Sequence, residues 1–181
     1  MKRKQTSYRS WLYTALSFLI PFVTMTTVLF VNKYAPFGKD TLLYSDMYHQ
    51  YFPFFKEFRR VLLSGESLIY NWSVGLGLDY LGLISYYLAS PLNLLSVLVP
   101  DTQVLNYFSM LMPIKLGLAG MFFGIFLQNI FKKQDPSIPI FSAFYATCAW
   151  AMGYQWNIMW LDTFALLPLV MVGMVSLLKD K

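Results

Sequence analysis

Charged residues are scarce in this sequence. They make up 13% of the 181 residues, whereas apolar residues make up 57% and aromatic residues 19%. An average soluble domain is about one quarter charged. Because a small globule leaves much of its surface in water, it cannot hide so large a surplus of apolar side chains. The composition therefore excludes a soluble domain and predicts a chain that is covered by lipid.

Cysteine and histidine are almost absent. The single cysteine, Cys148, lies in an apolar run, which excludes an internal disulfide and is typical of a small buried hydrophobe. The single histidine, His49, has no cluster of metal-binding neighbours and is typical of a surface or packing residue. No metal-ligand cluster, phosphate-binding glycine loop or nucleophile motif is present, so neither a metal site nor a cofactor is predicted.

The formal charge of +5 comes from short basic groups that stand beside apolar runs. A nucleic-acid-binding surface would need a continuous basic stripe. No nucleic-acid partner is therefore predicted, and the basic residues are better explained by membrane topology.

Long apolar runs predict an all-α membrane protein with about four transmembrane helices. A helix of about twenty residues crosses a hydrocarbon core of roughly 30 Å. The first run is too long for a signal-peptide core and lacks a small-x-small cleavage site, so we interpret it as a retained span that tolerates Pro21. The predicted spans cover residues 11–31, 104–130, 138–153 and 158–178.

Basic residues indicate the orientation of these spans. They gather before the first span, between the second and third, and after the fourth, at residues 2–9, 132–133 and 179–181. All three groups fall on one side of a four-span chain, and the basic side is cytoplasmic. We therefore expect both termini in the cytoplasm and an outer loop at residues 32–103, a long segment whose own basic residues weigh less.

The outer loop is far longer than a usual connection and is expected to have a purpose. Part of it repeats apolar residues at helical spacing, namely Met47, Tyr51, Phe54, Phe55, Phe58, Val61 and Leu62. The opposite face is polar, which is typical of a helix lying in the membrane interface. Pro53 either kinks this helix or starts it, with Asp46 to Phe52 then forming a separate approach segment.

Residues 80–99 are apolar enough for a further span. A fifth crossing would place Lys132 and Lys133 outside, and Ser90-Pro91 interrupts the run. We therefore favour a pair of interfacial or re-entrant helices, with Tyr86 and Tyr87 at headgroup depth.

An ordered set of short motifs resembles one known family. The set begins with Asp46-x-x-x-Gln50-Tyr51-x-Pro53, Gly65, Asn71-Trp72, Gly75 and Gly77, and Tyr86-Tyr87-x-x-Ser90-Pro91-x-Asn93. It continues with Lys115-x-Gly117-x-Ala119-Gly120, Trp160-Leu161-Asp162 and Leu167-Pro168-Leu169. In this order the motifs are similar to the bacterial YfhO family of membrane proteins.

The resemblance implies the N-terminal part of a GT-C-type glycosyltransferase in the bacterial plasma membrane. Such an enzyme takes a sugar from a polyprenyl-phosphate carrier and adds it, on the outer face, to an envelope polymer such as lipoteichoic acid. The expected partners are membrane lipid, the polyprenyl-phosphate sugar and the envelope polymer acceptor. Because family members are several times longer, the chain is expected to be a fragment that is inactive alone.

Glycosyl transfer from a lipid phosphate needs a base for the acceptor proton and cations for the leaving phosphate. The resemblance implies Asp46 as the base, early in the first outer loop, although Asp46 is also suited to capping the next helix. Gln50, one turn later, either orients a sugar hydroxyl or faces water. Arg59 and Arg60 are suited to holding a phosphate, with anionic lipid headgroups as the alternative ligand.

A charge inside an apolar span singles out Lys115, which needs either a partner or a wet cavity. It is predicted to hold the carrier phosphate or to pair with Asp162, unless it snorkels to the outer surface. Asp162, near the outer start of the last span, either shares a site with Asp46 or caps its helix. Asp79 is a further candidate of the same kind.

Two other functions remain open from the residues. A transporter or lipid flippase would use Lys115 and Asp162 as an intramembrane charge pair along a pathway. A non-catalytic scaffold would need no polar site. The long aromatic outer loop favours the glycosyltransferase, because a transporter more often keeps its polar residues at the midplane of broken helices.

Overall fold

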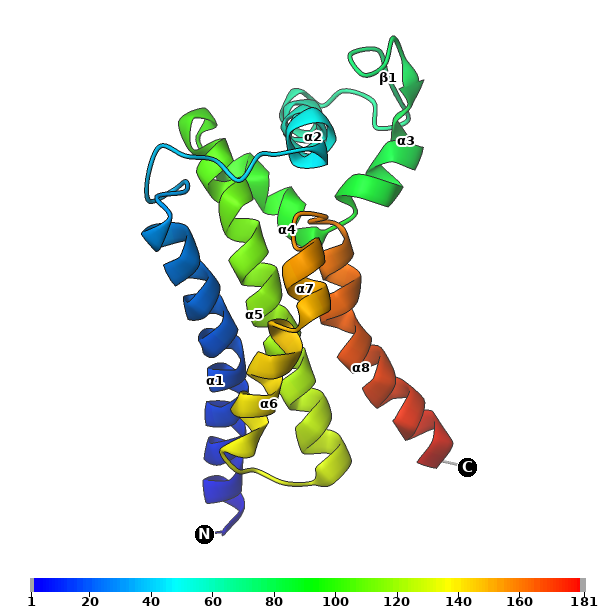
Figure 1. The fold of residues 1–181 in the computed structure, drawn as a ribbon. Coiled ribbons are helices and arrows are strands. Elements are labelled where there is room, and N and C mark those ends of the chain that lie inside the picture. Colours follow the sequence, from blue (N-terminus) through cyan, green and yellow to red (C-terminus); the bar gives the residue numbers. More distant parts are fainter. Residues whose placement is uncertain (1, 180–181) are drawn as a thin grey trace.

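Three long helices form the frame of the molecule (Figure 1). The computed structural model describes the backbone of residues 2–179 and the side chains of residues 9–178. The long helices are α1 (Lys2–Val31), α5 (Val104–Phe131) and α8 (Trp160–Lys179). Three apolar stretches are long enough to cross a membrane, Arg9–Val31, Asp101–Phe131 and Trp160–Leu178. The second one adds the short turn Asp101–Gln103 to α5. Three of the four predicted spans are therefore confirmed as continuous helices.

The third predicted span, residues 138–153, is not one helix. It is divided into α6 (Ser137–Ala146) and α7 (Ala149–Tyr154). At the break, the Thr147 hydroxyl donates to the Ala143 carbonyl at 2.7 Å, a side-chain bond that competes with the helical ladder and bends helices. Together α6 and α7 still carry the chain from one end of the bundle to the other (Figure 1).

The beginning of α1 and the end of α8 lie at the same end of the helical bundle, as expected for a chain that passes along it an even number of times (Figure 1). The opposite end carries the long connection between α1 and α5. Its elements are η1 (Met47–Tyr51), α2 (Phe52–Ser64), β1 (Tyr70–Asn71), β2 (Leu78–Asp79), α3 (Tyr80–Leu83), η2 (Ile84–Leu88), α4 (Pro91–Leu94), η3 (Leu95–Leu98) and η4 (Asp101–Gln103). The cytoplasmic placement of the termini stays a prediction.

The run at residues 80–99 folds as a sharply bent pair. The helix axis changes direction by 113° between its limbs, Tyr80–Leu88 and Pro91–Leu98. Pro91 occupies the first turn of α4, where a missing N–H costs nothing, and thus begins a new helix rather than continuing the old one. The chain enters and leaves this pair at the same end of the bundle (Figure 1). Whether the bent pair dips into the membrane or lies in its interface stays a prediction.

The amphipathic pattern in the outer loop is confirmed, but its apolar face contacts protein. Pro53 stands in the first turn of α2, and η1 runs directly into that helix. The apolar face is covered by the upper part of α5, by the bent pair and by Ile158. This core contains Met47, Tyr51, Phe55, Phe58, Leu88, Val104, Phe108, Leu111 and Ile158. This face is therefore buried against protein, because α5 extends beyond α1 at this end and supplies the covering surface (Figure 1). The position of the helix in the membrane interface stays a prediction.

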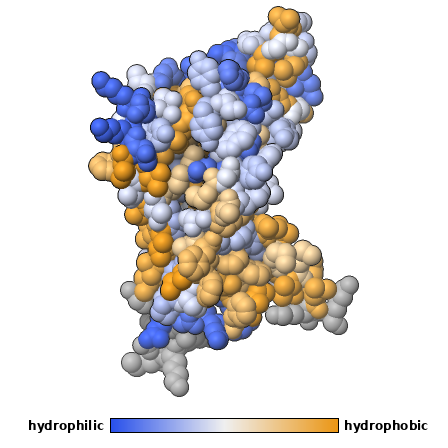
Figure 2. All heavy atoms as spheres, viewed as in Figure 1, coloured by the Kyte–Doolittle hydropathy of each residue, from blue (hydrophilic) through white to orange (hydrophobic). Residues whose placement is uncertain are grey.

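In the remainder of the bundle, α1 and α5 pack through small residues, and the outer faces of the helices expose apolar side chains. Gly120 and Gly124 of α5 face Ser17 of α1, which lets the two helices approach closely. Large apolar side chains of α8, including Leu177 and Leu178, are exposed. Figure 2 shows this hydrophobic surface on the long helices and hydrophilic side chains at the end that carries the connection. Such a surface fits a lipid environment.

Candidate functional site

Asp46 stands at the head of η1, a single turn of π-helix. Its side chain makes no capping hydrogen bond, so the structure gives no support to a capping role. The carboxylate accepts one long bond, 3.3 Å from Gln50 Nε2. Single π-helical turns are frequent at functional sites because they re-aim side chains that an α-helix would stack. Asp46 thus keeps most of its hydrogen-bonding capacity for another group.

Gln50 connects Asp46 to the bent pair. Its amide nitrogen donates to Asp46, and its Oε1 accepts from the Tyr87 hydroxyl at 3.1 Å. Tyr87 packs edge-on against Tyr86 and Phe54, with ring centroids 4.6 Å and 5.1 Å away. The two π-helical turns, η1 and η2, are therefore joined by a short polar chain that ends at Asp46.

Tyr51 holds η1 against the connection between α7 and α8. Its hydroxyl donates to Asn157 Oδ1 at 2.8 Å, and both side chains are buried, with 6% and 3% of their surface exposed. Burial, followed by the nearby Asp46 carboxylate, raises the pKa of Tyr51 to about 12. Asn157 lies in the connection between α7 and α8 and was not predicted to be functional. The only signal in the sequence was a pair of amide side chains, Gln155 and Asn157, between two apolar runs.

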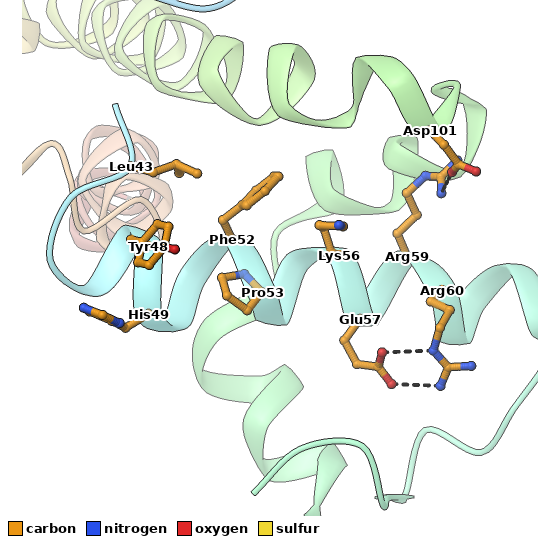
Figure 3. A pocket seen from close by; sticks show the side chains of 10 residues that line it. All are labelled: Leu43, Tyr48, His49, Phe52, Pro53, Lys56, Glu57, Arg59, Arg60 and Asp101. Atoms are coloured by element: carbon orange, nitrogen blue, oxygen red, sulfur yellow. Dashed lines mark hydrogen bonds and ion pairs between the residues drawn. The ribbon is translucent and has the colours of Figure 1, made fainter. Parts of the chain in front are cut away.

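A groove runs along one side of η1 and α2 (Figure 3). Its volume is about 740 Å³. The lining residues are Leu43, Tyr48, His49, Phe52, Pro53, Lys56, Glu57, Arg59, Arg60 and Asp101. Leu43 and Tyr48, which line the groove, stand on either side of Asp46 in the sequence, although Asp46 itself is not part of the lining. Aromatic side chains line one part of the groove and charged side chains gather at one end, an arrangement that suits a ligand with both polar and apolar parts (Figure 3).

Lys56 is the cation in this groove that the sequence did not single out. Its ammonium lies 6.0 Å from the centroid of the Phe52 ring, and it makes no ion pair with any side chain that the structure describes. The signal that would have found it is its position on α2, on the face away from the buried Phe55 and Phe58. Of the groove's cations, Lys56 has the least competition for an anionic ligand.

Arg59 and Arg60 are held in place by other groups. Arg59 donates to the carbonyls of Ser96 and Val99, at 2.9 and 2.6 Å, and to the Asp101 carboxylate at 2.5 Å. It thereby ties α2 to the end of the bent pair and the start of α5. Both arginines line the groove, but these bonds make them part of its wall. Their role as phosphate ligands stays a prediction.

Arg60 lies between two carboxylates. It makes a paired contact with Glu57, at 2.9 and 2.8 Å, and also contacts Glu66 at 2.5 and 2.8 Å. The hydrogen bonds from Arg60 hold the pKa of Glu57 below its usual value. Glu57 also accepts from the buried Asn71 amide at 2.7 Å, which fastens the β1–β2 hairpin to α2.

Lys115 and Asp162 form the ion pair that was one of the expected alternatives. Lys115 Nζ donates to Asp162 Oδ2 at 2.6 Å and to the Ile158 carbonyl at 3.0 Å. The Ser90 hydroxyl donates to the other carboxylate oxygen of Asp162 at 2.8 Å. Asp162 thus belongs to a different hydrogen-bond network from Asp46, and a shared site between the two acids gains no support.

Asp79 has a structural role as a helix cap. It is the N-cap of α3, and its carboxylate accepts from the Gly82 amide at 3.2 Å. Of the predicted site residues, the structure directly connects Asp46 with Gln50 and Lys115 with Asp162. In the part of the chain that the structure describes, no three histidine, cysteine or acidic side chains gather around a common point suited to a metal ion.

Comparison with known proteins agrees with the motifs. Residues 17–181 match the model of a family described as bacterial membrane protein YfhO. No curated protein and no solved structure gives a match. The matched region includes η1, the bent pair, α5 and the Lys115–Asp162 pair, which together make up the features described above. The chain therefore belongs to the YfhO family of bacterial membrane proteins.

Proposed function

We propose that this chain is part of a GT-C-type membrane glycosyltransferase that moves a sugar from a polyprenyl-phosphate carrier to a lipoteichoic-acid-like envelope polymer on the outer face. The observation that carries the proposal is the position of Asp46. Its carboxylate is not used for capping and makes one long hydrogen bond, and it stands at the head of η1, whose Tyr48 and His49 line the groove. The same groove contains Lys56, whose ammonium makes no ion pair with a described side chain. A base and a cation are the two groups that this reaction needs.

The proposed reaction displaces the carrier phosphate from the sugar. The acceptor hydroxyl oxygen attacks the anomeric carbon, the bond between that carbon and the phosphate oxygen breaks, and the phosphate leaves with the electron pair. Asp46 accepts the hydroxyl proton. Lys56 stabilises the negative charge that grows on the departing phosphate, while Arg59 and Arg60 shape the groove and add to its positive potential.

Gln50 and Tyr87 are assigned to positioning. Because Gln50 donates to Asp46 and accepts from Tyr87, it fixes the direction of the carboxylate. The Tyr51–Asn157 bond holds the same turn against the connection between α7 and α8. A general base must be held within hydrogen-bond reach of the proton that it removes, and these contacts restrict its motion.

The test is made in the native bacterium, with the intact protein replaced by variants. Asp46→Asn is expected to leave the amount of protein in the membrane unchanged and to abolish sugar on purified lipoteichoic acid, measured as sugar per phosphate by mass spectrometry. Asp135→Asn, at the other end of the bundle, is the matched control with normal glycan. Normal sugar content in the Asp46→Asn strain would remove Asp46 from the mechanism.

The variant Lys56→Gln distinguishes phosphate binding in the groove from proton removal by Asp46. It is expected to reduce the sugar content through weaker binding of the carrier, so that a larger supply of carrier lipid in isolated membranes restores part of the transfer. Asp46→Asn is not expected to respond to added carrier, because it lacks the proton acceptor. A Lys56→Gln variant with wild-type transfer at low carrier concentration would exclude the groove as the phosphate site.

The Lys115–Asp162 pair is the observation that favours the second candidate, a transporter or lipid flippase. In vesicles reconstituted with the intact protein, a flippase would speed the loss of inner-leaflet fluorescent phosphatidylglycerol to an external quencher, and Asp162→Asn would slow it. If the protein is a glycosyltransferase, the exchange rate of phosphatidylglycerol should equal that of protein-free vesicles. Fast exchange that depends on Asp162 would favour the flippase and contradict the glycosyltransferase proposal.

A further inference from the structure

The chain leaves α1 through a closed loop that folds back on the end of the helix. The Tyr34 amide donates to the Leu29 carbonyl at 3.0 Å, which fastens the loop to the last turn of α1. The Ala35 amide donates to the Asp40 carbonyl at 2.8 Å, and the Asp40 amide donates to the Lys33 carbonyl at 3.2 Å. These bonds close residues 33–40 into a defined shape instead of an open linker.

The loop and the end of α1 enclose a hollow of about 570 Å³. It is lined by Phe30, Val31, Lys33, Phe37, Gly38, Lys39 and Asp40. Phe30 and Phe37 meet edge-to-face, with ring centroids 5.7 Å apart, and provide an apolar wall. Lys33 and Lys39 make no ion pair with any described side chain, although the Asp40 carboxylate shares the hollow.

The hollow lies where lipid headgroups would be. The apolar stretch of α1 that is suited to a membrane ends at Val31, so the residues that follow stand at the boundary between hydrocarbon and water. Figure 2 shows hydrophilic side chains projecting beside hydrophobic ones at this end of α1. Below the hollow, α1 exposes Val23, Val28 and Phe30, so its apolar wall continues into the lipid-facing surface of the helix.

We propose that this hollow binds the headgroup of an anionic phospholipid. The ammonium groups of Lys33 and Lys39 contact the phosphate, and the first acyl methylenes lie along Phe30 and Val31. Two unpaired cations against one carboxylate favour an anionic ligand, and the continuous apolar surface favours a lipid over free phosphate. The site does not depend on the sugar-transfer chemistry proposed for Asp46.

The test uses the intact chain purified in detergent and native mass spectrometry, which counts bound lipids during titration. Phosphatidylglycerol is expected to bind as a single tight lipid, and phosphatidylcholine more weakly. The double variant Lys33→Gln/Lys39→Gln is expected to weaken phosphatidylglycerol binding roughly twenty-five-fold, or about five-fold for each lysine, with little change for phosphatidylcholine. Inorganic phosphate is expected not to displace the lipid, and displacement at equal concentration would assign the hollow to free phosphate.

Two further variants test the site without removing a cation. Asp40→Asn takes away the carboxylate that shares the hollow and is expected to tighten phosphatidylglycerol binding several-fold. Gly38→Ala keeps every charge, but its added methyl group would overlap the Lys33 carbonyl, so the loop must open. It is expected to weaken phosphatidylglycerol binding while thermal unfolding shows a folded bundle.

The matched charge control is Lys132→Gln/Lys133→Gln at the other end of α5, which is expected to leave the tight lipid in place. An equal loss of binding in this control would show that the attraction is diffuse. Unchanged binding in both the Gly38→Ala and the Asp40→Asn variants would likewise overturn the proposal.

Discussion

The Lys115 ammonium and the Asp162 carboxylate meet at 2.6 Å and join the middle of α5 to the first turn of α8. The two side chains differ in exposure. Only 2% of the Lys115 side chain is exposed, compared with 26% for Asp162. Asp162 also accepts from Ser90 at the bend of the bent pair, so the ion pair connects three elements. A buried cation with one carboxylate partner is more vulnerable than a carboxylate with several donors.

We therefore predict that the two halves of this pair are not equivalent. Asp162→Ala leaves the Lys115 ammonium buried without a counter-charge and is expected to cost roughly 3–5 kcal/mol of unfolding free energy. Lys115→Met leaves Asp162 with Ser90 and partial access to water, so the expected loss is about 1–3 kcal/mol. Thermal unfolding in detergent, followed by circular dichroism, measures both.

The double variant Lys115→Met/Asp162→Ala provides the control. It removes both charges, so we expect it to be more stable than Asp162→Ala alone. Equal destabilisation by the two single variants would contradict the asymmetry that burial predicts.

Long-range polar contacts mark the limit of what the sequence predicted. The spans of α1, α5 and α8 could be read from uninterrupted apolar runs, because lipid demands about twenty such residues in each crossing. The Lys115–Asp162 pair was one of the predicted alternatives, since a charge within an apolar run needs a partner. Helical periodicity also placed Met47, Tyr51, Phe55 and Phe58 on one face, and the structure buries all four.

The candidate site was less predictable because its contacts join segments far apart in the chain. Tyr51 and Asn157 are 106 positions apart, and neither is unusual in its local sequence. The Arg59 guanidinium group is bound by the carbonyls of Ser96 and Val99, at the end of the bent pair, and the sequence does not reveal this contact. Whether the apolar face of α2 contacts lipid or protein depends on how far α5 extends beyond α1. The periodicity of α2 does not predict that distance.

Tyr51 gives a prediction for alkaline pH. Its pKa in the folded state is about 12, whereas the ordinary value is 10.0. Between these values the unfolded chain loses the phenolic proton and the folded chain keeps it, so the unfolding free energy falls as the pH rises through this window. Absorbance titration of the folded chain at 295 nm is expected to show one late-titrating tyrosine fewer in Tyr51→Phe. An unchanged curve above pH 11 would place that titration elsewhere.

The close contact between α1 and α5 makes Gly120 intolerant of a side chain. A methyl group there would overlap the Ser17 carbonyl and press on Pro21, so the two helices must separate. We expect Gly120→Ala to lower the unfolding free energy by about 1–3 kcal/mol, the usual cost of overpacking. Gly173→Ala in α8 is the matched control: its methyl group meets no atom within 4 Å. That control is expected to gain up to about 1 kcal/mol from helix propensity.

Glu57 and Glu66 both contact Arg60, but only Glu57 also holds the hairpin. Its side chain is 16% exposed and accepts from the buried Asn71 amide, whereas Glu66 is 52% exposed. Glu57→Ala leaves the Asn71 amide without a partner, which costs about 1–3 kcal/mol and accelerates local opening roughly ten-fold or more. Hydrogen exchange at the Gly77 and Tyr80 amides, which close the hairpin, measures this opening. Glu66→Ala removes only exposed contacts and is expected to change the exchange rates less than three-fold. If the two variants accelerated exchange equally, the hairpin would depend on the charge of Arg60 and not on the Glu57–Asn71 bond.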